Sequence, residues 1–293
     1  MNKSQNRASI EDINYWKKIN PDSRITSQPW PTSSHDINFE SEELARYKRS
    51  LISEGYFQTR PCIDEDQLDK LITCTSRVML AGHAPAYALL YDDFFEILSS
   101  LNRLLTELLG TDFLMVPDEP DVYFIPTSNQ HGGTEPHRDT LRHHNRYDDT
   151  GIPDVINIWI PLTDSTPLNS CMHVIPAHSD PDFYRPGSDD ITPRNFDSET
   201  LQSVRALPAK AGSVLGWSTS LLHWGGRSSQ LADIPRLSFA MYFQRGGVKK
   251  HHQVATTIPF KMSFDYRLYL VEKVWRDPDG IELPNFIETT LQG

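Results

Sequence analysis

The segment His137-Arg138-Asp139 constrains the fold of this chain most, because its two outer residues are metal ligands at the spacing of a strand. Side chains alternate along a β-strand with a period of two, so His137 and Asp139 of an extended segment point to the same side. A second histidine, His223, and an arginine, Arg236, follow far along the sequence. The pattern predicts a β-rich core in which two imidazoles and one carboxylate bind one metal ion.

An isolated H-x-D pair is common by chance, and the alternative is an exposed histidine beside a solvated aspartate. The segments that follow it favour a metal site. Each of them is short, apolar and bounded by turn residues, which is typical of strands. The predicted strands are 154–162, 171–176, 211–217, 221–226 and 235–243.

A series of motifs lies between about residues 122 and 244, which is under half of the chain. They are H-x-D at 137–139, W-I-P-L at 159–162, N-S-C-M-H-V-I-P at 169–176, A-G-S-V at 211–214, H-W-G-G at 223–226 and R-x-S at 236–238. Taken together, these motifs resemble the phytanoyl-CoA dioxygenase family of iron(II)- and 2-oxoglutarate-dependent oxygenases.

The resemblance implies a fold and a site. The expected fold is α+β, with a double-stranded β-helix core (a jelly roll, cupin-like) buttressed by N-terminal helices. His137, Asp139 and His223 would bind iron(II) as the catalytic centre, because two imidazoles and one carboxylate on one face of the ion leave three positions open. Those positions would take 2-oxoglutarate and dioxygen.

The resemblance also implies a reaction, in which 2-oxoglutarate is decarboxylated to succinate and the oxidant takes a hydrogen atom from a substrate C–H bond. We expect hydroxylation of an unactivated C–H bond in a small metabolite, in secondary or amino-acid metabolism. Halogenating members of the family replace the carboxylate ligand with glycine or alanine, whereas this chain keeps Asp139. Desaturation, ring closure and epoxidation remain alternatives.

Arg236 is the candidate that would bind the distal carboxylate of 2-oxoglutarate, because its planar guanidinium matches a carboxylate with two parallel hydrogen bonds. Ser238, two residues further along the strand, shares its face. The alternative is an internal pair between Arg236 and one of the 39 acidic residues. Arg227 is a competing candidate, but it lies in a Gly/Ser-rich loop.

Further side chains are predicted near the site. Asn157 and Trp159 share one face of a predicted strand that the resemblance puts beside the keto acid, and a core role is the alternative for Trp159. His143 and His144 lie in a polar run that reads as a loop, where contact with substrate and exposure to solvent are both open.

Two other classes of function remain open. A non-catalytic jelly-roll or cupin-like small-molecule binding protein would share the fold, and fold alone does not exclude it. A metal-dependent hydrolase or isomerase could use the same three ligands, although it has no need of Arg236. The sequence contains no G-x-S-x-G, no G-x-x-x-x-G-K-[ST] and no H-E-x-x-H motif, which argues against serine hydrolases, nucleotide hydrolases and zincins.

The composition of the chain indicates which classes of binding partner and which cell compartment to expect. The formal net charge of −11 disfavours nucleic acid and anionic membranes, so we expect a small-molecule substrate and a monomer or homodimer. The three cysteines, Cys62, Cys74 and Cys171, are too few for a disulfide framework and favour a reducing compartment. The sequence has no run of 18 apolar residues and no apolar signal segment at its start, so we predict a cytoplasmic protein.

The predicted organisation is a polar, partly ordered N-terminal arm followed by a single oxygenase domain. Helices are expected where apolar residues recur at helical spacing between capping signals. The loop 180–207 and the loop 138–153 are expected to influence the choice of substrate, and the C-terminal segment is expected to form a lid or a dimer contact. The boundaries are 1–40 for the arm, 41–293 for the domain, about 112–245 for the jelly roll, 41–55, 64–80 and 92–109 for helices, 56–63 for a strand and 259–293 for the C-terminal segment.

Overall fold

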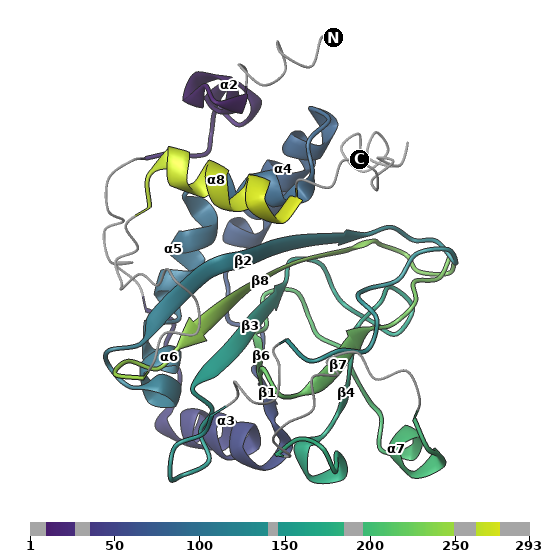
Figure 1. Ribbon diagram of the computed structural model, residues 1–293. Helices are drawn as coiled ribbons and strands as arrows, with labels where there is room; N and C mark the ends of the chain where they lie inside the picture. The colour runs from purple at the N-terminus through teal and green to yellow at the C-terminus, as the bar shows by residue number, and fades with distance from the viewer. Residues whose placement is uncertain (1–9, 27–35, 140–145, 185–195, 249–261, 276–293) are drawn as a thin grey trace.

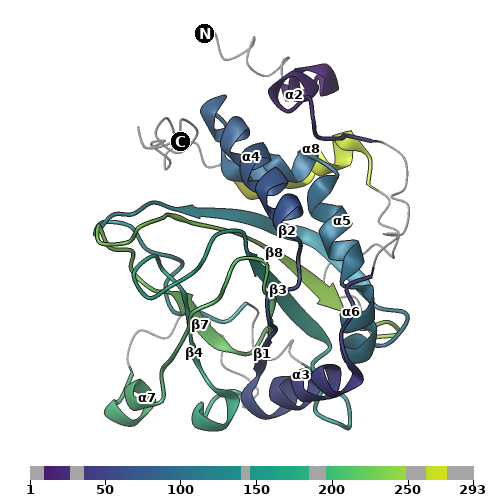
Figure 2. The same cartoon turned by 180° about the vertical axis from the view of Figure 1, so that it is seen from behind.

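The computed structural model describes residues 10–26, 36–139, 146–184, 196–248 and 262–275 (Figures 1 and 2). Two antiparallel sheets form the core, and helices cover the outer face of the larger sheet. A cluster of apolar side chains from both sheets, including Trp159 and Met172, fills the space between them.

The larger sheet has five strands within the described residues, in the order β1-β6-β3-β8-β2. All of its strand pairs are antiparallel. Its strands are β1 (Tyr56–Gln58), β6 (Leu215–Ser218), β3 (Val155–Pro161), β8 (Arg236–Gln244) and β2 (Leu114–Ile125).

The smaller sheet consists, in the described part of the chain, of β5 (Arg205–Leu207), β4 (Met172–Ile175) and β7 (Leu222–Gly225), in that order. The segment that leads to the H-x-D motif runs beside β7 and the residues after it, with isolated bridges between His137 and His223 of β7 and between Gly132 and Arg227. This arrangement of two facing sheets fits the predicted jelly roll, and the α+β fold class is confirmed.

Strand alternation decides which side chains face the site. In β8, Phe239 and Met241 pack with the helices, whereas Ala240 packs between the sheets. In β3, Ile158 packs with the helices and Trp159 packs between the sheets. The period of two therefore directs the polar positions of both strands into the interior between the sheets.

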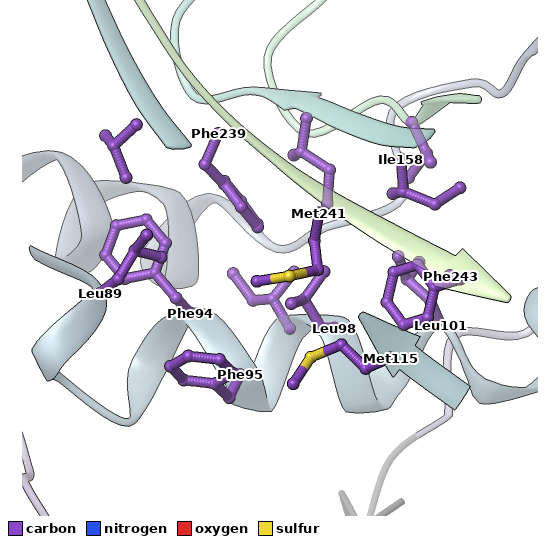
Figure 3. Packing of buried hydrophobic residues seen from close by; sticks show 14 of the residues in the cluster. Leu89, Phe94, Phe95, Leu98, Leu101, Met115, Ile158, Phe239, Met241 and Phe243 are labelled. Carbon is purple, nitrogen blue, oxygen red and sulfur yellow. The ribbon is translucent and has the colours of Figure 1, made fainter. Parts of the chain in front are cut away.

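Helices supply the outer layer. α5 (Asp93–Ser100) packs against the larger sheet together with α4 (Glu65–Leu80), α6 (Asn102–Leu109), α8 (Phe264–Trp275) and the short η1 (Pro85–Leu90). Figure 3 shows the side chains of this contact. They are Leu89 of η1, Phe94, Phe95 and Leu98 of α5, Leu101, and Met115, Ile158, Phe239, Met241 and Phe243 of the sheet.

The predicted helices at 41–55 and 64–80 are confirmed. α3 (Ser41–Glu54) begins with a capping box in which the N-cap residue Glu40 and Glu43 bond reciprocally. It ends at Gly55, whose φ of 81° is readily adopted only by glycine.

The prediction of one long helix over 92–109 is wrong, because the chain breaks at Leu101 into α5 and α6. The backbone amide of Ile37 donates to the carbonyl of Ser100 at 2.9 Å. The hydroxyls of Ser99 and Ser100 also donate to carbonyls one turn back, a pattern that bends helices. These bonds take backbone acceptors that a continuous helix would use.

The predicted N-terminal arm, the predicted strand at 56–63 and the predicted loop at 180–207 agree only in part with the structure. In the predicted arm, α2 (Ile13–Ile19) buries Trp16 completely. The predicted strand over 56–63 is shortened to β1. Two 3₁₀ or α segments, η3 (Ala177–Ser179) and α7 (Ser198–Gln202), lie in or beside the predicted loop 180–207, of which 185–195 is outside the described residues. The division into an arm and one domain stays a prediction.

No described helix combines the length and the apolar character that crossing a bilayer requires.

Candidate metal centre and cosubstrate pocket

The backbone brings the two candidate imidazole ligands together. His137 and His223 exchange two backbone hydrogen bonds of 3.0 Å, although His137 belongs to an isolated bridge and not to a regular strand. The close approach depends on two glycines beside them: a Cβ added to Gly133 would lie 2.5 Å from the Cα of Gly225. Larger residues at either position would push the two segments apart.

One atom from each of His137, Asp139 and His223 lies within 4.8 Å of the others, so the three side chains can hold one metal ion. Oδ1 of Asp139 is 3.5 Å from Nε2 of His137 and 3.4 Å from Nε2 of His223. The Nδ1 atoms lie 2.7 Å from the Glu135 carbonyl and 3.0 Å from the Leu221 carbonyl. In the neutral rings these carbonyls select the Nδ1–H tautomer, which leaves the lone pair of each Nε2 for a metal.

The carboxylate of Asp139 is also fixed from behind. Its Oδ2 accepts hydrogen bonds from Nε1 of Trp217 at 2.8 Å and from Nδ2 of Asn157 at 3.2 Å. Oδ1 is therefore the oxygen that faces the two imidazoles. Asn157, predicted as a cosubstrate contact, lies against the metal-ligating group itself.

Electrostatics favour the deprotonated, metal-binding forms of Asp139 and His223, whereas in the absence of a metal they favour the protonated form of His137. Burial would raise the pKa of Asp139, but the charges and hydrogen bonds of His223, His137 and Trp217 outweigh it and lower this pKa well below its ordinary value. Burial lowers the pKa of His223 to about 4. Burial also acts to lower the pKa of His137, but Asp139 outweighs it and the pKa is raised.

Replacing Trp217 with phenylalanine removes the N–H group that holds Oδ2 of Asp139 while keeping most of the ring. We expect iron(II) affinity to fall by about 10- to 100-fold, as is usual when a partner of a ligand is lost. Trp159→Phe is the matched control, because Trp159 lines the same cavity without a hydrogen bond to Asp139 among those the structure describes. Equal iron affinities of the two variants would contradict the role of Trp217.

Arg236 is 2 % exposed and lies in the same cavity as the three candidate ligands. Its Nη1 donates to the carbonyl of Ser170 and lies 3.3 Å from the Ser170 hydroxyl. Ser170 has a φ of 74°, which for a residue other than glycine marks a specially held backbone. Burial lowers the pKa of Arg236 to about 10, so the guanidinium is still charged at neutral pH.

Several buried polar atoms in or beside this pocket have no hydrogen-bond partner among the described residues, including Nε of Arg236, Oγ of Ser238 and Oδ1 of Asn157. Arg236 forms no ion pair with a carboxylate in the described part of the chain, so the alternative of an internal pair is not realised there. A buried guanidinium without a carboxylate is costly, and an anionic ligand would remove that cost.

Aromatic and acidic neighbours complete the pocket. The guanidinium carbon of Arg236 lies 5.8 Å from the centre of the Trp159 ring. Tyr123 pairs with Ser238 in the sheet and lines the cavity. Asp121 lies on the same face of β2, and burial raises its pKa to about 7, so near neutral pH it is partly protonated and competes less for Arg236.

The cavity also contains residues that the sequence analysis did not select. Tyr123 and Trp217 could have been found from the period of two along their strands, whereas nothing local singles out the others. The residues that line the cavity are Tyr123, Thr134, His137, Asp139, Asn157, Trp159, Met172, Trp217, His223, Gly225, Arg236 and Ala240.

The competing candidates lie elsewhere. Arg227 is exposed and lines a separate surface hollow beside Trp224. His173 stacks on Trp224, with ring centres 5.6 Å apart, and it is not among the residues that line the metal cavity. The predicted loop histidines, His143 and His144, fall outside the described residues.

Comparison with protein families gives a match over residues 52–232 to the family described as phytanoyl-CoA dioxygenase (PhyH), which is more than half of the chain. This chain belongs to the PhyH family. The predicted family is confirmed, and with it the assignment to non-haem oxygenases that use iron and 2-oxoglutarate. The site residues described above lie within the matched range, with the exception of Arg236 and its strand neighbours.

Solved structures share the PhyH-like fold at low sequence identity. The epimerase SnoN, solved in complex with Fe³⁺, α-ketoglutarate and nogalamycin RO, has a TM-score of 0.55 and 15 % identity, covering 75 % of this chain and 98 % of its own. The apo non-haem monooxygenase ThoJ has a TM-score of 0.56 and 14 % identity, covering 78 % and 99 %. The carbocyclase SnoK from nogalamycin biosynthesis has a TM-score of 0.52 and 15 % identity, covering 78 % and 95 %. No curated relative matches the chain.

Proposed function

We propose that the protein hydroxylates an unactivated C–H bond of a small metabolite, with His137, Asp139 and His223 as the ligands of iron(II). The ligand set supports this role, because two neutral imidazoles and one carboxylate suit a ferrous ion and leave coordination positions for other molecules. The retained Asp139 carboxylate favours hydroxylation over halogenation.

The cosubstrate role of Arg236 and Ser238 is part of the same proposal. The distal carboxylate of 2-oxoglutarate is the anion that would use the free Nε of Arg236 and the free Oγ of Ser238. The ring of Trp159, which lies near the guanidinium of Arg236, would pack against the carbon chain of the keto acid. The single observation that carries the proposal is this buried guanidinium, which has no carboxylate partner among the described residues and lies in one cavity with the three ligands.

Iron(II), when bound, would activate dioxygen, with 2-oxoglutarate as the cosubstrate that is oxidised. The chain's own residues fix the geometry around it. Trp217 and Asn157 hold the carboxylate of Asp139, while the Glu135 and Leu221 carbonyls orient the imidazoles.

The guanidinium of Arg236 also separates this proposal from a non-catalytic binding protein. A jelly-roll protein that only binds a small molecule has no requirement for a metal triad and a dicarboxylate anchor in one cavity. The three free cysteines suit the reducing cytoplasm, where iron(II) and 2-oxoglutarate are available, and the net charge of −11 suits a small-molecule substrate better than nucleic acid.

The first experiment is an anaerobic titration of the protein with iron(II) and 2-oxoglutarate. We expect the visible charge-transfer band of the iron–keto acid chelate to appear and saturate at one equivalent of iron. A folded, iron-loaded protein that shows no band would contradict the assignment of the site.

A second experiment identifies the type of reaction. A metabolite library is screened for succinate release, and each product is analysed by mass spectrometry. Hydroxylation adds one oxygen atom, ring closure or desaturation removes two hydrogen atoms, and epimerisation leaves the mass unchanged. The last two outcomes would replace hydroxylation with the reaction types named for the structural neighbours SnoK and SnoN.

A further inference from the structure

Arg138 lies between two candidate metal ligands in the sequence, yet it is not among the residues that line the metal cavity. It is 2 % exposed, which is unusual for an arginine and requires strong partners. Its Nη1 lies 2.6 Å from Oδ2 of Asp180 and donates a hydrogen bond to the carbonyl of Ser220. The Asp180 side chain is 5 % exposed, so this is a buried ion pair.

The two partners belong to different segments. Ser220 precedes His223 by three residues, in the turn that also supplies the Leu221 carbonyl for the His223 ring. Asp180 follows η3 and opens a turn in which its carbonyl accepts from the amide of Phe183 at 3.1 Å. The guanidinium of Arg138 therefore connects the segment that carries His137 and Asp139 to the turn before His223 and to the segment after η3.

Tyr147 joins the same two segments by separate contacts. Its hydroxyl donates to Oγ of Ser220 at 2.7 Å. Its ring centre lies 6.0 Å from that of Phe183 and 5.3 Å from that of Tyr184. Through Tyr147, the segment 180–184 is thereby attached to the turn before His223 by both polar and aromatic contacts.

We propose that Arg138 is a positioning residue for the metal centre, which holds His137 and Asp139 in register with His223 through its ion pair with Asp180 and its bond to Ser220. The inference rests on the proposed function, in which these three residues bind iron(II). It adds that the segment 180–184, which lies outside the ligand-bearing segments, takes part in fixing the ligands. Loss of the Asp180 charge leaves the Arg138 guanidinium buried without a counter-ion, and the ligand segment must shift to solvate it.

The chain offers a matched control in a second buried pair of the same chemistry. Nη1 of Arg267 in α8 lies 3.1 Å from Oδ1 of Asp92 and donates to the carbonyl of Leu90. Both side chains are 1 % exposed. Arg267 belongs to α8 and Asp92 directly precedes α5, two helices that lie on the outer side of the larger sheet (Figure 1). A purely structural role of a buried arginine–aspartate pair should therefore look the same at Asp92 and at Asp180.

The test compares Asp180→Asn with Asp92→Asn in the full chain. Iron(II) is titrated anaerobically at saturating 2-oxoglutarate, the charge-transfer band gives the apparent iron affinity, and thermal melts of the metal-free proteins give stability. We expect both variants to lose thermal stability, but only Asp180→Asn to lose iron affinity, by about 10- to 100-fold. Wild-type iron affinity in a folded Asp180→Asn would overturn the inference.

Arg138→Lys provides an independent variant that keeps the positive charge and loses the planar fork. We expect its iron affinity to lie between that of the wild type and that of Arg138→Met. If Asp180→Asn does not fold, Arg138→Lys decides: weaker iron binding supports the inference and unchanged binding rejects it. A wild-type protein without the band would reject the proposed function itself, whereas a normal wild-type band with unaffected variants would reject only the positioning role.

Discussion

Replacing Asp139 with glycine is expected to abolish succinate formation and substrate oxidation. The change removes the one anionic ligand, whose Oδ1 lies 3.5 Å and 3.4 Å from the two imidazole nitrogens. Losing a partner that only orients a ligand costs about 10- to 100-fold in metal affinity or activity, so losing the ligand itself should cost at least about 100-fold. The measurement is succinate release at saturating iron(II) and 2-oxoglutarate.

The control for this variant must separate a lost ligand from a lost fold. Asp139 also accepts hydrogen bonds from Trp217 and Asn157, and glycine leaves both donors unpaired. Asn157→Ala removes one of these donors and keeps the ligand, so it should retain measurable turnover under the same conditions. A folded Asp139→Gly protein with wild-type succinate release would exclude Asp139 as a ligand.

Most of the metal centre could be predicted from the sequence because its signals are local. The H-x-D spacing fixes two ligands, and the period of two along β3 and β8 puts Trp159 and Arg236 on interior faces. His223 follows from its place in the order of motifs. The inferences for His137, Asp139, Trp159 and Arg236 use residue type and position within one short segment, whereas that for His223 uses the order of several motifs along the chain.

The rest depends on contacts between segments that no local pattern records. The helix over 92–109 breaks because the amide of Ile37 takes the carbonyl of Ser100. The bond from Trp217 to Asp139 joins two residues that lie far apart in the sequence. The left-handed backbone of Ser170, which turns its carbonyl toward Arg236, is favoured by no property of serine itself. Tertiary structure selects all three.

Replacing Arg236 with alanine is expected to weaken 2-oxoglutarate binding by about 1.5–3 kcal/mol, the usual contribution of hydrogen bonds to charged groups. This loss corresponds to an increase in the dissociation constant of about 10- to 150-fold. The physical reason is that Nε of Arg236 and Oγ of Ser238 have no protein partner among the described residues, so the ligand is their only source of hydrogen bonds there. The measurement is the titration of the charge-transfer band with 2-oxoglutarate at fixed iron(II).

The sequence provides the matched control in Arg227→Ala, because Arg227 was the competing candidate and is exposed outside the cavity. We expect this variant to bind 2-oxoglutarate as the wild type does, and Ser238→Ala to show a smaller loss than Arg236→Ala. Iron affinity in the absence of 2-oxoglutarate should be unchanged in Arg236→Ala, since the guanidinium does not contact the ligand set in the described structure. Unchanged 2-oxoglutarate affinity in Arg236→Ala, together with a loss in Arg227→Ala, would transfer the anchoring role to Arg227.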